Sequence, residues 1–80
     1  MHELALTREI VAIVCQAAAG RRVHTVTLEV GEWSCAAPEA LEFCFQAVAQ
    51  GTCAANARLD IRRTGGDDLM VTRMEIEEAA

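Results

Sequence analysis

Residues 23–32 read VHTVTLEVGE and alternate between apolar and polar side chains. A period of two with many β-branched residues is typical of a β-strand that buries one of its faces. We therefore predict a strand here, with Val26, Leu28 and Val30 on the face that packs against the core. His24 has the same parity, and we expect it to be a partly covered structural histidine.

On both sides of this strand the apolar spacing changes to that of a helix. In residues 4–19 apolar side chains recur at i, i+4, i+7, i+8 and i+11, and Gly20 is suited to end the helix in a left-handed conformation. Pro38 sets the backbone for the first turn of a second helix, which stops at Gly51. The predicted buried positions of the two helices are Leu6, Ile10, Ile13, Val14, Ala17, Leu41, Cys44, Phe45 and Val48.

The last third of the chain predicts two further strands, residues 57–63 and 67–77. Between them lies Thr64-Gly65-Gly66-Asp67, and a Gly-Gly pair favours a two-residue type I′ or II′ turn. We therefore expect these strands to pair as a hairpin. The predicted core side of the hairpin carries Ala57, Leu59, Ile61, Met70, Thr72 and Met74, and its other side carries Arg58, Asp60, Arg62, Leu69, Val71 and Arg73.

These elements predict a single α/β (α+β) domain over residues 1–80, in the order helix, strand, helix, strand, strand. The first two strands and the helix between them form one βαβ unit, which would be parallel with a right-handed crossover. Both helices would then cover one face of a three-stranded mixed sheet. The other, more polar face would be exposed to solvent.

The composition limits the class of protein. Eighty residues suffice for one small core, and no apolar run approaches the roughly 18 residues of a membrane span. A net charge of −5 argues against a nucleic-acid partner, which needs a clustered positive field. We expect a cytoplasmic protein, because the first residues lack the features of a secretory signal. No phosphate-binding glycine loop or paired catalytic carboxylates are recognisable, so we do not expect an enzyme.

Four cysteines, Cys15, Cys35, Cys44 and Cys53, are separated by 20, 9 and 9 residues. No two of them form the Cys-x-x-Cys knuckle of a structural zinc site, and a disulfide scaffold is typical of secreted chains. We therefore predict four reduced thiols, with neither structural zinc nor a native disulfide.

The first residues, Met1-His2-Glu3, suggest a metal chelate. The α-amine of Met1, the amide nitrogen of His2 and its imidazole can close fused rings on one ion, and such nitrogen-rich planar sites favour Ni(II) or Cu(II). On local grounds alone, a solvent-exposed histidine in a frayed terminus is an alternative interpretation.

Several segments in the same order resemble the HypA family of hydrogenase nickel-insertion accessory proteins, over nearly the whole chain. The resemblance implies a non-enzymatic nickel metallochaperone with the fold predicted above. The segments are residues 1–6, 26–32, 38–45, 51–52, 57–61, 66–69 and 74–77.

The resemblance also implies a site and partners. Ni(II) would be bound by Met1, His2 and Glu3, with backbone nitrogens of His2 and Glu3 among the donors. The Glu3 carboxylate would tune charge or contact a partner, or else act as a favourable acid at the start of a helix. The expected partners are the maturation GTPase and the large subunit of nickel-iron hydrogenase, with a homodimer by strand exchange as a further possibility.

One departure from the family is clear in the sequence. Its members carry a zinc domain with two Cys-x-x-Cys knuckles between the last two strands, whereas here residues 63–67 join the strands directly, so no zinc is expected. This is either a natural short relative or a chain from which the zinc domain was removed, and the predicted hairpin favours removal. The alternative function is a protein-interaction module that docks the GTPase through its first helix without carrying nickel.

Overall fold

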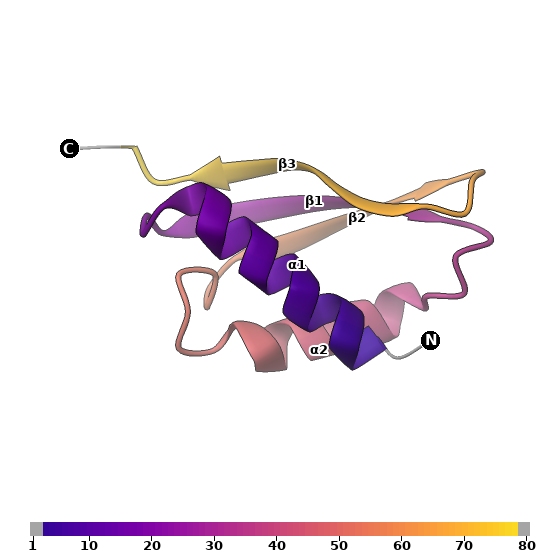
Figure 1. The fold of residues 1–80 in the computed structure, drawn as a ribbon, viewed down its shortest axis with the longest axis horizontal. Helices are drawn as coiled ribbons and strands as arrows, with labels where there is room; N and C mark the ends of the chain where they lie inside the picture. Colours follow the sequence, from indigo (N-terminus) through magenta and orange to yellow (C-terminus); the bar gives the residue numbers. More distant parts are fainter. Residues whose placement is uncertain (1–2, 79–80) are drawn as a thin grey trace.

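The computed structural model describes residues 3–78 and has both helices on one face of a three-stranded mixed sheet (Figure 1). This confirms the predicted fold class and element order. Within the same residues, neither helix has the length and apolar character that crossing a membrane requires. The elements are α1 (Glu3–Ala18), β1 (Val23–Gly31), α2 (Pro38–Ala49), β2 (Arg58–Thr64) and β3 (Leu69–Ile76).

The strand β1 lies in the centre of the sheet, whose order is β2-β1-β3. It pairs in parallel with β2, as the βαβ unit predicts, and antiparallel with β3. The predicted hairpin between the last two strands is therefore wrong, and the argument for removal of a zinc domain that rested on it falls too. A central position allows the most apolar strand to satisfy its backbone hydrogen bonds on both edges, which alternation along the sequence does not reveal.

The segment after β2 bridges the end of β1 instead of turning back. The amide of Gly31 donates to the carbonyl of Asp68 at 2.7 Å, and the amide of Trp33 donates to the carbonyl of Gly66 at 3.0 Å. Neither Gly65 nor Gly66 has a left-handed φ, so the predicted primed turn is absent. Where this segment crosses β1, the structure requires a glycine at position 31, because a Cβ there would lie 2.3 Å from the carbonyl oxygen of Gly66.

Two register shifts in the pairing of β1 with β3 change which side chains of these two strands face the core. Val71 pairs with Leu28 and Arg73 pairs with Thr27, so Thr72 is an extra residue on β3. As a result Leu69 and Val71 pack against the core, whereas Met70 and Thr72 are exposed, against the predicted parity. The second shift lies between Val23 and Thr25, and it leaves His24 exposed where we expected partial burial.

The core lies between the sheet and the two helices and includes the predicted Val26, Leu28 and Val30. The buried face of α1 is rotated from the predicted one, since Ile13 and Ala17 are exposed. Thr7 is buried instead, because its hydroxyl donates to the carbonyl of Glu3 at 2.6 Å and so has a partner. The buried residues of the two helices are Thr7, Ile10, Val11, Val14, Ala18, Leu41, Phe45 and Ala49; Leu6 and Val48 are partly buried against this core, and Cys44 is also half-buried.

The bridge over β1 gives a first prediction. Gly31→Ala should lower the free energy of unfolding by about 1–3 kcal/mol, because the new methyl group meets backbone that cannot rotate away. In a domain of this size that corresponds to a fall in melting temperature of at least about 5 °C.

The matched control is Gly65→Ala, where an added Cβ meets no atom within 4 Å and φ is not left-handed. Its melting temperature should be unchanged or slightly raised, since alanine reduces the entropy of the unfolded chain. Equal melting temperatures for the two variants would contradict the close approach at Gly31.

Candidate metal site at the start of the first helix

The predicted metal site lies at the start of α1. Met1 and His2 lie outside the described residues, so Glu3 is the member of the predicted set that the structure places. Its carboxylate oxygen Oε2 accepts a hydrogen bond from the backbone amide of Ala37 at 3.2 Å, and its carbonyl accepts one from Thr7. Residue 3 is therefore held to its own helix and to the segment before α2.

The contact with Ala37 gives the Glu3 side chain a structural role, because it links the start of α1 to the start of α2. Ala37 is the N-cap residue of α2 and has the extended backbone of such a position, but alanine has no side-chain oxygen to cap the helix. The carboxylate comes from a residue 34 positions earlier and lies where the positive ends of both helix dipoles favour a negative charge. Sequence reasoning missed this contact, because no local pattern links two residues so far apart.

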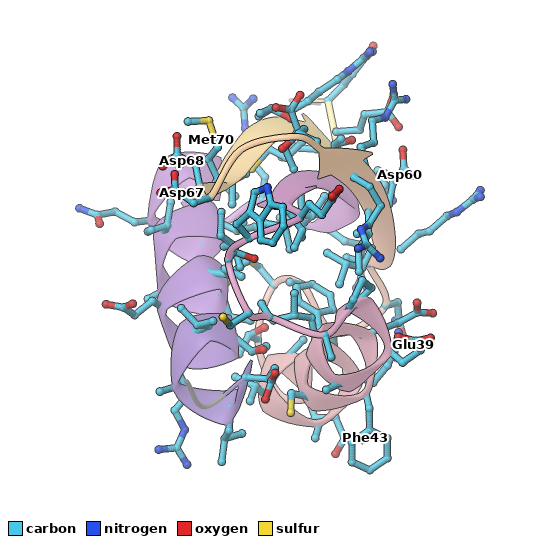
Figure 2. All side chains as sticks on the ribbon, turned by 90° about the vertical axis from the view of Figure 1, so that its right-hand side faces the viewer. Glu39, Phe43, Asp60, Asp67, Asp68 and Met70 are labelled. Carbon is cyan, nitrogen blue, oxygen red and sulfur yellow. The ribbon has the colours of Figure 1, made fainter. Side chains whose placement is uncertain are left out.

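Acidic side chains at this end of the molecule do not converge on one point. Figure 2 shows Asp67 and Asp68 on the side of β3, while Glu39 on α2 and Asp60 on β2 lie on the opposite side. Among residues 3–78, no three His, Cys, Asp or Glu side chains are grouped so as to hold a metal ion. His24 belongs to the start of β1, which follows the C-terminal end of α1, whereas Glu3 is the first residue of that helix (Figure 1).

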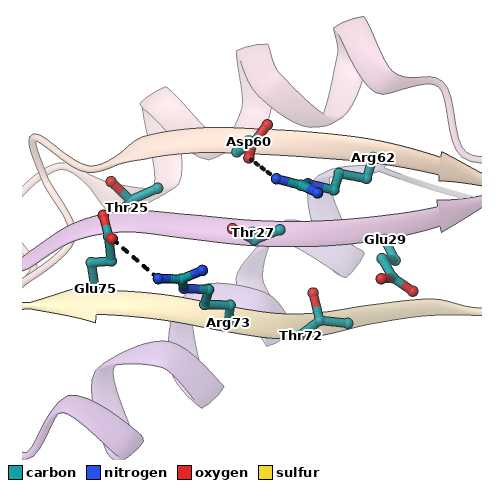
Figure 3. A pocket seen from close by; sticks show the side chains of 8 residues that line it. All are labelled: Thr25, Thr27, Glu29, Asp60, Arg62, Thr72, Arg73 and Glu75. Atoms are coloured by element: carbon teal, nitrogen blue, oxygen red, sulfur yellow. Dashed lines mark ion pairs between the residues drawn. The ribbon is translucent and has the colours of Figure 1, made fainter.

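A second polar surface is the face of the sheet that the helices leave uncovered (Figure 3). Arg62 forms an ion pair with Asp60 at 3.5 Å, and Arg73 forms one with Glu75 at 3.6 Å. In each pair both residues lie on the same strand, and their side chains are largely exposed to solvent. Exposed pairs of this kind contribute little to stability. The surface is a solvated sheet face, as its polar residues predict, and its charges largely neutralise one another. It is lined by Thr25, Thr27, Glu29, Asp60, Arg62, Thr72, Arg73 and Glu75.

The four cysteines lie in different surroundings. Cys35 is exposed in the loop before α2 and Cys44 is half-buried on that helix. Cys15 and Cys53 are brought together, with their sulfur atoms 2.8 Å apart. The spacing of the cysteines along the chain gave no sign of this pair, because it depends on how α1 packs beside the turn that follows α2.

Most of the chain matches a known protein family. Residues 1–67 match a family model described as "Hydrogenase/urease nickel incorporation, metallochaperone, hypA". The chain belongs to the HypA family. The resemblance drawn from the sequence is thus confirmed for these residues.

Individual HypA proteins support this assignment. The chain is 50% identical over 66 residues to hydrogenase maturation factor HypA of Geobacter sulfurreducens, an alignment that covers 82% of this chain and 60% of the relative. It is 48% identical to the factor of the same name from Trichodesmium erythraeum, over 82% of this chain and 58% of the relative. The chain therefore spans about 60% of the length of the curated relatives it matches.

A solved structure agrees on the fold. The solution structure of the Ni metallochaperone HypA from Helicobacter pylori superposes with a TM-score of 0.74 at 14% sequence identity. The superposition covers 98% of this chain and 95% of the other. The HypA fold is thus formed by the elements described above.

The contact between Glu3 and Ala37 gives a second prediction. Glu3→Ala should lower the free energy of unfolding by about 1 kcal/mol, because α2 loses the oxygen that accepts from its N-cap residue and both helices lose a favourable charge. Alanine has a higher helix propensity than glutamate, so a loss cannot be attributed to propensity.

Glu9→Ala is the control, since Glu9 lies exposed on the same helix. Thermal unfolding of both variants at low salt is the measurement. If Glu3→Ala unfolded at the same temperature as Glu9→Ala, the carboxylate would not support the start of α2.

Proposed function

We propose that this HypA chain is a nickel metallochaperone that binds Ni(II) through Met1, His2 and Glu3 and delivers it for maturation of nickel-iron hydrogenase. The observation that carries the proposal is the family match, which begins at residue 1 and so includes the chelating residues. Nickel is a cargo here, and no reaction of the chain's own is proposed.

The chemistry of these residues suits Ni(II). The amine of Met1, the imidazole of His2 and the backbone nitrogens of His2 and Glu3 form a set of nitrogen donors that can lie in one plane, which favours Ni(II) over Zn(II) or Mg(II). The first four N–H groups of an α-helix stand outside its i→i−4 ladder. Metal binding at the backbone nitrogens of His2 and Glu3 would therefore leave the hydrogen bonds within α1 intact.

Release follows from the same donors. Protons compete with the metal for the amine, the imidazole and the amide nitrogens, and no buried cage has to open. The bond from Ala37 to the Glu3 carboxylate supports a fixed position for residue 3 beside the start of α2. The donors would then be presented at the end of the molecule where both helices begin, within reach of a recipient protein.

The proposed partners are the maturation GTPase and the large subunit of the hydrogenase. We also propose that the chain lacks a zinc domain at the joint between β2 and β3, because residues 65–68 connect these two strands directly. A zinc domain inserted at this joint in longer relatives would then have no counterpart here. Two chains that exchange β3 would form a homodimer, and size-exclusion chromatography would distinguish this dimer from a monomer.

The third prediction concerns nickel binding. The chain with a free Met1 amine should bind about one Ni(II), with the absorbance of a planar nitrogen-ligated site, and His2→Ala should abolish binding. His24→Ala is the control, since His24 is an exposed histidine at the other end of α1. An uncleaved N-terminal tag converts the amine to an amide, so a tagged chain that bound nickel equally well would rule out the chelate.

A second candidate function, docking of the GTPase without nickel transport, is favoured by the apolar surface of α1. Leu4 is 44% exposed and Ile13 is 57% exposed. Between α1 and β3 runs an apolar groove, and such grooves receive apolar segments of partners. The residues of the groove are Leu6, Glu9, Ile10, Ile13, Leu69, Met70 and Val71.

A fourth prediction separates the two functions. Ile13→Glu should weaken capture of the GTPase at least tenfold while nickel binding is unchanged, because a carboxylate is placed in the apolar contact. His2→Ala should show the opposite pattern. A chain that captured the GTPase but took up no nickel, with its terminus intact, would favour the docking function.

A further inference from the structure

The pair Cys15 and Cys53 lies where two parts of the chain meet. Cys15 is near the end of α1 and Cys53 lies in the turn between α2 and β2, 38 residues later. Both are partly buried and pack against the core. The thiol of Cys53 donates to the sulfur of Cys15 at 2.8 Å, and a disulfide bond would require the two atoms to approach by less than about 1 Å.

The backbone around Cys53 is fixed by its own hydrogen bonds. The carbonyl of Cys53 accepts from the amide of Val23 at 2.9 Å. The hydroxyl of Thr52 donates to the carbonyl of Ala49 at 2.6 Å and accepts from the amide of Ala54 at 3.1 Å. These bonds fix the backbone of the turn that carries Cys53 and tie it to the start of β1.

The geometry suits a covalent bond between the sulfurs better than a shared metal ion. Two thiolates at about 2.3 Å from a tetrahedral zinc ion lie roughly 3.8 Å apart, which is well beyond the observed 2.8 Å. Among residues 3–78, no third His, Cys, Asp or Glu side chain completes a metal cluster with them.

We propose that Cys15 and Cys53 form a reversible intramolecular disulfide when the chain meets a low-molecular-weight disulfide such as oxidised glutathione. The sequence-based expectation of four reduced thiols then describes the reduced form of the protein. The proposal does not depend on nickel binding, since Cys15 is 12 residues, or about 18 Å of helix, from Glu3.

The two thiols take different parts in the exchange. Burial and, to a smaller extent, the neighbouring Cys15 together raise the pKa of the Cys53 thiol to about 11. Little Cys53 thiolate is present at neutral pH, so Cys15 makes the first attack. Its thiolate bonds to one sulfur of oxidised glutathione and expels the other as a glutathione thiolate, which takes up a proton.

The second step closes the bond within the chain. Cys53 gives up its proton to solvent and attacks the sulfur of Cys15 in the mixed disulfide, which expels the second glutathione. In total, two protein thiols are oxidised to one disulfide, and one oxidised glutathione is reduced to two molecules of glutathione. The new bond ties the end of α1 to a turn that also holds the start of β1.

The test is incubation of the whole chain with graded ratios of reduced and oxidised glutathione, followed by alkylation after denaturation and peptide mapping. We expect oxidised protein to retain two alkylatable thiols, Cys35 and Cys44, and to yield a peptide linking Cys15 to Cys53. Its melting temperature should rise by about 10 °C, because the bond restricts the unfolded chain, and should return to its starting value with a dithiol reductant.

Two variants keep the test decisive. Cys15→Ala should eliminate both the linked peptide and the oxidative rise in melting temperature, whereas the double variant Cys35→Ser with Cys44→Ser should keep both. Nickel uptake by the oxidised chain should equal that of the reduced chain. Four alkylated thiols at every glutathione ratio, or a disulfide that maps to Cys35 or Cys44, would overturn the proposal.

Discussion

The backbone of β1 is hydrogen-bonded along both edges, and the arrangement of the other elements depends on this. Its inward side chains, Val26, Leu28 and Val30, are almost fully buried, so a helical layer must cover them. The parallel neighbour β2 can be reached only through a crossover, which α2 provides. The remaining edge is then taken by β3, and α1 fills the half of the covered face beside it.

The sequence was sufficient for those features that follow from local periodicity. The positions of both helices and the inward face of β1 follow from apolar spacing, and the parallel βαβ unit follows from element order. The failures have a common physical cause, which is that contacts between distant residues override local pattern. A bulge opposite Thr27 and Leu28, for example, shifts the parity of β3. The burial of Thr7 is the exception, because its hydroxyl bonds to the carbonyl of Glu3 one helical turn earlier.

The same distinction holds for the candidate site. The proposed chelate of Met1, His2 and Glu3 could be predicted from the sequence, because it depends on adjacent residues. The attachment of Glu3 to Ala37 could not be predicted, because it joins the starts of two helices across 34 positions. The approach of Cys15 to Cys53 is of this kind as well, since it depends on how the end of α1 packs beside the turn after α2.

The crossing of residues 65–68 over the end of β1 has a consequence for chain length in this family. Two strand spacings, about 10 Å, separate β2 from β3, so four residues suffice to bridge them and must press against Gly31 to do so. A longer connection would leave and re-enter at the same two strand ends. Such a connection would not need to contact Gly31, and it would start beside the loop that contains Trp33. The same loop leads to Ala37, whose amide donates to the Glu3 carboxylate. Additional residues at this point would therefore be placed at the end of the molecule where both helices start, and β2 and β3 could keep their pairing with β1.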